Sequence, residues 1–131
     1  MNRLTALWLA GLAACSSQAV APSGAGLCWR MSEPGGDQAT FRVIARDVPN
    51  LESCAVQLDG ARMIEGQSTQ GAYNGYFIFA TEDQVTSART MEATRIRVFE
   101  AEDREEIRAG LRALIENDRA STEPTAERAA D

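Results

Sequence analysis

The chain has 131 residues, a formal net charge of −6 and no histidine, and all 13 of its basic residues are arginine. The missing histidines remove the usual general base and the commonest metal ligand, which excludes most hydrolase mechanisms. We therefore expect no catalytic residues, no metal site and no cofactor. A net negative small domain is also a poor nucleic-acid binder, because neutralisation of phosphates drives that affinity.

The first fifteen residues have the layout of an export signal. Arg3 precedes an uncharged, largely apolar run over residues 4–14, and this run is too short to span a bilayer, which needs about 20 residues. A conventional cleavage after Ala21 also satisfies the small-residue rule for signal peptidase. It would leave Pro22 at the first mature position, where proline fits that enzyme poorly.

The tetrad Leu12-Ala13-Ala14-Cys15 resembles the lipobox of bacterial lipoproteins. The resemblance implies that residues 1–14 are removed as a signal peptide, that the Cys15 sulfur carries diacylglycerol, and that the new amine is acylated. Two or three acyl chains anchor a protein stably in a membrane. We therefore expect a lipid-anchored envelope protein facing the periplasm. Ser16 favours the outer membrane over the inner, because the aspartate associated with inner-membrane retention is missing.

Composition divides the remaining chain into three parts. Residues 15–26 are small and lack a periodic apolar face, so we expect a lipidated flexible tether with a reach of at most about 35 to 40 Å. Residues 27–117 form the single domain. Residues 118–131 have little to bury and are expected to be a disordered acidic tail.

The domain has two cysteines, Cys28 and Cys54. Export to an oxidising compartment makes a disulfide the default pairing. A redox motif would place only two residues between the cysteines, and a metal site has little support because the chain has no histidine. We predict a disulfide that contributes roughly 3.5 kcal/mol on the loop-entropy model.

Two strands are expected at residues 27–31 and 40–46, with a turn over residues 33–37 between them. In the second strand, alternation places Phe41, Val43 and Ala45 on one face, and Ile44 blurs the pattern. The next element is a helix over residues 51–63. Asn50 is its expected cap, and its apolar stripe contains Leu51, Cys54, Ala55 and Leu58.

Residues 72–80 are the most apolar run after the signal and predict a central strand. The pair Asn74-Gly75 often forms a tight hairpin turn, which would place Tyr73 and Tyr76 on opposite arms. We favour a bulge within one strand, because the loop expected at residues 65–71 leaves too few residues for an arm.

Two further strands are expected at residues 85–88 and 94–99, the second with Ile96 and Val98 pointing inward. The last helix covers residues 101–117. Its apolar stripe consists of Ile107, Leu111, Leu114 and Ile115. Arg104, Arg108 and Arg112 lie at four-residue spacing, and we expect them at the solvated surface with weak ion pairs.

Few residues are candidates for a functional site. Trp29, Tyr73 and Tyr76 are amphipathic aromatics that can form a partner-binding patch, although a small domain also needs most of its aromatics in the core. Glu82 and Asp83 are the least implausible pair of acting carboxylates, but adjacent carboxylates in a turn more often solubilise the chain.

The pattern L-E-x-C-A-x-x-L at residues 51–58, followed by G-A-Y-N-G-Y-F-I-F at residues 71–79, is similar to small uncharacterised exported proteins of proteobacteria. That resemblance supports the first helix and the central strand and implies no activity. In size and location the chain also resembles the single-disulfide lipoprotein inhibitors of cell-wall lysozymes, but it lacks their serine-glycine loop signature.

Together these features predict an α+β fold: a small antiparallel sheet of four to five strands in the order β-β-α-β-β-β-α, with two helices packed on one face and one disulfide. The expected function is that of a non-enzymatic, membrane-anchored lipoprotein that binds another envelope protein or stabilises an assembly. The alternative is a small periplasmic inhibitor or ligand-binding lipoprotein. A deep apolar pocket would favour a ligand, and a flat exposed aromatic face would favour a protein partner.

Overall fold

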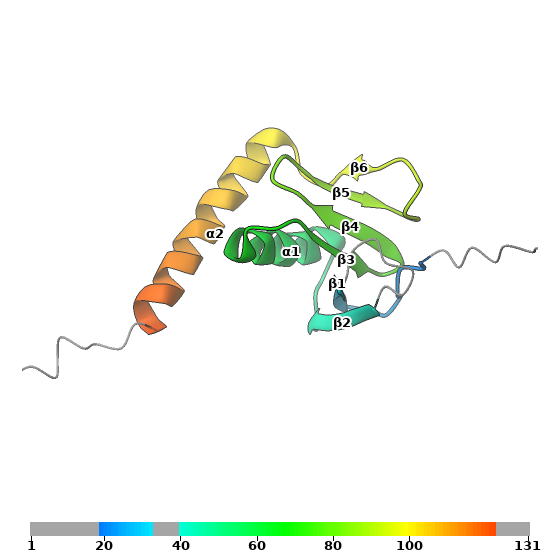
Figure 1. Cartoon of the computed structure of the whole chain (residues 1–131), viewed down its shortest axis with the longest axis horizontal. Coiled ribbons are helices and arrows are strands. Elements are labelled where there is room, and N and C mark those ends of the chain that lie inside the picture. The colour runs from blue at the N-terminus through cyan, green and yellow to red at the C-terminus, as the bar shows by residue number, and fades with distance from the viewer. Residues whose placement is uncertain (1–18, 33–39, 123–131) are drawn as a thin grey trace, which may run out of the picture.

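The computed structural model describes residues 19–32 and 40–122. It confirms the α+β class: one antiparallel sheet with two helices (Figure 1). In chain order the elements are β1 (Cys28–Ser32), β2 (Thr40–Ala45), α1 (Leu51–Glu65), β3 (Thr69–Tyr73), β4 (Tyr76–Ala80), β5 (Val85–Ala88), β6 (Ile96–Arg97) and α2 (Ala101–Thr122). Six strands lie side by side in the order β2-β1-β3-β4-β5-β6. Cys15 and the turn expected at residues 33–37 are outside the described residues.

Helix α1 begins at its predicted cap and ends at a glycine. The Asn50 side chain accepts a hydrogen bond from the Ser53 amide at 2.8 Å, as expected of an N-cap. Gly66 ends the helix in the left-handed conformation, with φ of 71°, and its amide donates to the Arg62 carbonyl at 2.8 Å. The helix extends two residues beyond the predicted end at Met63.

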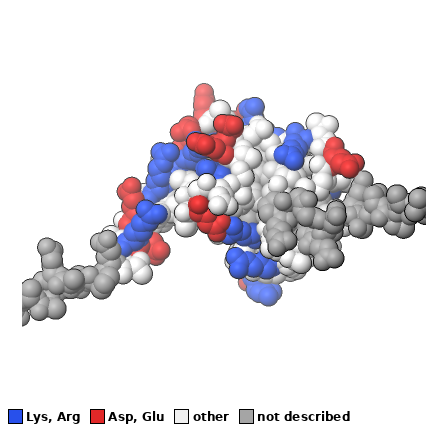
Figure 2. Space-filling view, viewed as in Figure 1, with Lys and Arg blue, Asp and Glu red and all other residues white. Residues whose placement is uncertain are grey.

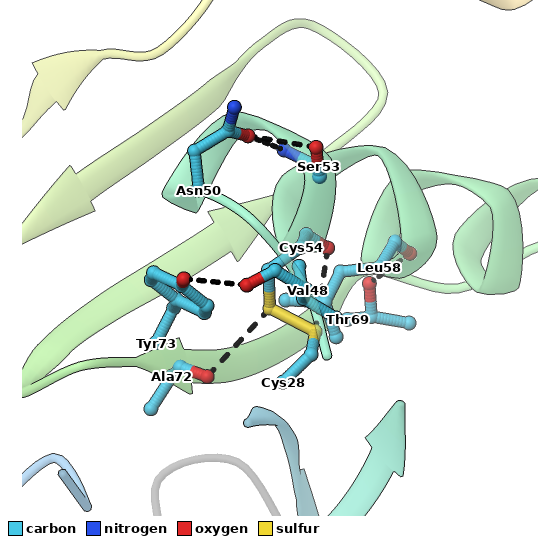
Figure 3. The surroundings of a disulfide bond; sticks show 9 residues. All are labelled: Cys28, Val48, Asn50, Ser53, Cys54, Leu58, Thr69, Ala72 and Tyr73. Carbon is cyan, nitrogen blue, oxygen red and sulfur yellow. Dashed lines mark hydrogen bonds between the residues drawn. A yellow bond between two sulfur atoms is a disulfide. The ribbon is translucent and has the colours of Figure 1, made fainter. Parts of the chain in front are cut away.

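The predicted disulfide is confirmed and joins β1 to α1 at the centre of the core (Figure 3). Cys28 and Cys54 have no exposed surface, and their Cα atoms are 5.3 Å apart. Around them the Thr69 hydroxyl donates to the Leu58 carbonyl at 2.7 Å, and the Tyr73 hydroxyl donates to the Val48 carbonyl at 2.7 Å. These bonds attach α1 and the segment before it to β3.

The prediction of one bulged strand over residues 72–80 is wrong, because this segment forms a hairpin. Asn74 and Gly75 both have positive φ angles, 47° and 83°, as a two-residue turn of the primed type requires. Tyr73 pairs with Tyr76 across the turn. The missing arm is β3, in a segment expected to be mostly loop, and this strand and a separate β4 raise the strand count above the predicted four to five.

Each face of the sheet carries its own apolar cluster. The face under α1 contains the disulfide, Leu58, Ile78 and Val85. The opposite face contains Met31, Ala72, Phe77 and Phe79. Parity along β2 places Phe41 on the second face, whereas Ile44 and Ala45 pack against the first cluster, so the predicted grouping of Ala45 with Phe41 is wrong. A register shift in the β1–β2 pairing accompanies this change.

Residues 19–26, which the sequence assigned to the tether, pack on the domain. Ala21 is 6% exposed and belongs to the cluster on the face opposite α1, against which Ala19 also packs. The Pro22 carbonyl accepts a hydrogen bond from the Gly75 amide at 3.1 Å, and the Gly26 carbonyl accepts one from the Val48 amide at 2.9 Å. The segment from Ala19 onward therefore belongs to the domain, contrary to the predicted boundary at residue 27.

The sequence predicted that both helices pack on one face of the sheet. The second helix, α2, does not lie on the sheet beside α1. It packs across α1 and runs away from the sheet (Figure 1), and Arg104 is its only buried residue among those described. It ends at Thr122, beyond the predicted Asn117, so part of the expected tail is helical. Before it, β6 is only two residues long. Ile96 is 69% exposed at this edge, contrary to prediction, while Val98 packs against the core.

Candidate interaction surface at the helix crossing

The two helices cross closely because α1 has a glycine at the contact. Gly60 is buried, and a Cβ atom at this position would lie 3.4 Å from a terminal carbon of Leu111 on α2. A larger side chain would push the helices apart. The crossing therefore depends on a small residue of α1 facing the apolar stripe of α2.

A buried ion network holds the crossing together. Asp59 has no exposed surface and accepts from the Arg62 Nε at 2.7 Å and from an Arg104 Nη at 3.4 Å. Arg104 also donates to the Thr81 carbonyl beyond β4. Burial lowers the pKa of Arg104, with Arg108 and Arg62 adding to the decrease and Asp59 opposing it.

The expectation that Arg104 lies at the surface is wrong. It lies three residues before Ile107 and seven before Leu111, so it shares their stripe, and this spacing was the missed signal.

An apolar groove of about 430 Å³ lies on one side of the crossing. Its floor is α1, one wall is the second half of α2, and Arg30 with Ile44 forms the far side. Two large aliphatic side chains face this groove while highly exposed: Ile64 at 60% and Leu114 at 66%. The apolar stripe predicted for α2 is thus only partly covered by the rest of the domain.

The rim of the groove carries an ion pair between β1 and the end of α1. Arg30 donates two hydrogen bonds to Glu65, one of them 2.7 Å long. These bonds lower the pKa of the Glu65 carboxyl and raise the pKa of Arg30. Arg30 is the only charged residue among those lining the groove, and its charge is already matched by Glu65.

The structure does not bring the three candidate aromatics together. Trp29 packs against the cluster on the face opposite α1, whereas Tyr73 packs against the cluster under α1. Tyr76 lies across the hairpin turn from Tyr73, where its hydroxyl accepts from Arg89 at 3.0 and 3.2 Å. Directly paired residues share a face of the sheet and successive residues alternate, so the register places Tyr73 and Tyr76 on one face and Trp29 on the other.

Glu82 and Asp83 are both exposed in the turn after β4. Within the described part of the chain, no three or more histidine, cysteine, aspartate or glutamate side chains form a group that could hold a metal ion. Nor does any helix in residues 19–32 or 40–122 have the length and apolar character needed to cross a bilayer.

Comparisons with protein-family models, with curated proteins and with solved structures found no match to this chain.

Proposed function

We propose that this protein is a non-enzymatic envelope lipoprotein, anchored through Cys15, that binds an apolar segment of another envelope protein in the groove between α1 and α2. The observation that carries this proposal is the exposure of Ile64 and Leu114 in one groove. Clustered exposed aliphatics rimmed by polar residues are typical of protein interaction sites. The groove is lined by α1 residues from Val56 to Ile64 and by α2 residues from Leu111 to Ile115, so a segment of polypeptide could contact both helices.

The position of the proposed anchor supports this use of the groove. Ala19 packs on the sheet face opposite α1, and Cys15 is four residues earlier in the sequence. Four residues span at most about 14 Å. The lipid therefore lies near the face opposite α1, and the helices point away from the membrane surface. Ser16 stands where the aspartate associated with inner-membrane retention would be, so we expect the anchor in the outer membrane.

The lining of the groove also describes the segment that it would bind. The α2 wall consists of Leu111, Leu114 and Ile115, and the nearby ion pair between Arg30 and Glu65 leaves no unmatched charge in the lining. A segment with aliphatic or aromatic side chains would gain about 25 cal/mol for each Å² of apolar surface removed from water. A charged segment would lose hydration without gaining a partner.

In-cell photo-crosslinking tests this proposal. We expect a photoreactive amino acid at Leu114 to capture a discrete envelope protein, and Ile64→Glu in the same chain to abolish that product. The matched control places the photoreactive residue at Ile96, which is equally exposed at the far edge of the sheet. Identical products from positions 114 and 96, or a product at 114 that survives Ile64→Glu, would contradict groove binding.

A second candidate function is that of a small periplasmic inhibitor or ligand-binding lipoprotein. The observation that favours this function is a second cleft, separate from the apolar groove, that is lined by arginines.

A further inference from the structure

A cleft of about 350 Å³ lies between α2, the end of α1 and the turn after β4, and its lining shares only Ile115 with that of the apolar groove. Four arginines line it, Arg62, Arg108, Arg112 and Arg119, together with Glu82 and Glu116. Figure 2 shows basic and acidic side chains interspersed along α2. We propose that this arginine cleft is a binding site for a phosphate ester on a hydroxyl-bearing carrier.

The protein holds two of these arginines in place. Arg62 uses its Nε to bond Asp59, so its terminal nitrogens remain available at the cleft. Arg108 donates to Glu105 at 3.3 Å and to the Glu82 carbonyl. These bonds fix guanidinium groups from both helices at the cleft wall. Preorganised donors lose less conformational entropy when a ligand binds.

The other two arginines lack a partner. Within residues 19–32 and 40–122, Arg112 and Arg119 make no hydrogen bond or ion pair, although Glu116 lies in the same cleft. Arg108, Arg112 and Arg119 follow one another at intervals of four and seven residues, which places them on one face of α2. An oxyanion bound in this cleft would therefore face several guanidinium groups at once.

The shape and chemistry of the cleft indicate the class of ligand. A guanidinium group presents paired N–H donors that match phosphate oxygens in a bidentate arrangement. The cleft falls in the size range of small-molecule sites, which leaves room for a carrier beside the phosphate. The carboxylates of Glu82 and Glu116 can accept hydrogen bonds from hydroxyl groups of that carrier. A phosphorylated polyol meets both requirements, either free or as the headgroup of a lipid.

Calorimetric titration of the full chain carrying Cys15→Ser, which removes the proposed acylation site, tests this site. One arm uses inositol 1-phosphate, and the other uses phosphatidylcholine vesicles with or without phosphatidylinositol. We expect saturable binding in at least one arm. Binding to the free ester identifies a small-molecule ligand, and binding only to phosphatidylinositol vesicles identifies a lipid headgroup. No binding at millimolar ligand in either arm, or equal binding to both kinds of vesicle, would overturn the proposal.

Three substitutions distinguish specific binding in the cleft from non-specific electrostatic attraction. Arg112→Gln and Arg119→Gln should each weaken binding about tenfold, as expected for the loss of about 1.4 kcal/mol from a charge-assisted hydrogen bond. Arg46→Gln makes the same charge change at an exposed position outside the cleft and should leave affinity unchanged. An equal loss from Arg46→Gln would show non-specific attraction only. The melting temperature of each variant checks that the fold is intact. Crosslinking from Leu114 does not use this cleft, so failure here leaves the proposed partner binding standing.

Discussion

The sheet requires glycine at position 71, because there is no room for a side chain there. A Cβ atom there would lie 2.1 Å from the Trp29 carbonyl oxygen and 2.7 Å from a methyl carbon of Leu58. Neither the β1 backbone nor the core under α1 can make room without moving. Gly71→Ala should therefore lower the free energy of unfolding by about 3 kcal/mol, the upper end for overpacking, as measured by urea denaturation.

Gly110 provides the matched control for this substitution. It lies inside α2, and a Cβ atom added there would have no contact within 4 Å. Gly110→Ala should raise the free energy of unfolding by up to about 1 kcal/mol, because alanine has the higher helix propensity. If Gly71→Ala proved as mild as Gly110→Ala, the close approach of β3 to β1 would be wrong.

The ion pair between Arg30 and Glu65 makes a specific contribution to the pH dependence of stability. Because Arg30 lowers the folded-state pKa of Glu65, the stabilisation is present above the carboxyl's ordinary pKa of about 4.3. It is lost as the pH falls through the lowered folded value. Urea titrations between about pH 5 and pH 3 should show a smaller decrease for Glu65→Gln than for the unmodified chain. Arg30→Gln should remove the same component, and unchanged profiles for both variants would contradict the pairing.

At the level of elements, the sequence was most informative where the signals were local. The Asn50 cap and the apolar spacing of Leu51, Cys54 and Leu58 belong to α1 itself, so the start and the buried face of α1 could be predicted. Its end at Gly66 was missed by two residues. The disulfide was predicted from the oxidising compartment that an export signal implies, and the position of Cys54 in the apolar stripe of α1 agrees with it. Strand β3 could not be predicted in the same way, because Gln70 and Gly71 have little intrinsic strand preference and are held by pairing with β1 and β4.

The candidate groove shows a further limit of sequence analysis. The stripe of Leu111, Leu114 and Ile115 was predicted correctly as one face of a helix. Whether that face is covered depends on how α2 crosses α1, which is set by Gly60 and by the ion network of Asp59 and Arg104. These contacts join residues far apart in the chain. The spacing within α2 places Arg104 on the apolar stripe, but it does not show which residues of α1 that stripe meets.

The disulfide is the covalent link between β1 and α1, so its removal tests how these two elements are held together. It closes a loop with a sequence separation of 26 residues, for which loop entropy predicts a contribution of about 3.5 kcal/mol. The double variant Cys28→Ala/Cys54→Ala should lose at least this stability in urea denaturation, with some addition from the cavity left in the core. Cys15→Ala removes a cysteine outside the described residues and should leave the midpoint unchanged. Reduction of the disulfide without any change in midpoint would contradict this account.

At the scale of the whole molecule, the packing of residues 19–26 shortens the tether that we propose between the domain and the membrane. A free segment over residues 15–26 would let the domain move up to about 40 Å from the lipid. With Ala19 and Ala21 packed on the sheet, the distance from Cys15 to the domain is at most about 14 Å. If Cys15 carries the lipid, we expect the anchor on the side of the sheet opposite the helix groove, with a bound partner held close to the membrane but not against it.

The central claim is that Cys15 carries the lipid that fixes this arrangement, and intact mass spectrometry of the protein recovered from the envelope of its native cells tests it most directly. The account predicts a chain that begins at Cys15, with the added mass of a diacylglyceryl group and an amide-linked acyl chain, and with Cys28 bonded to Cys54. A chain that retains Met1, or one that begins at Pro22 without lipid, would contradict it.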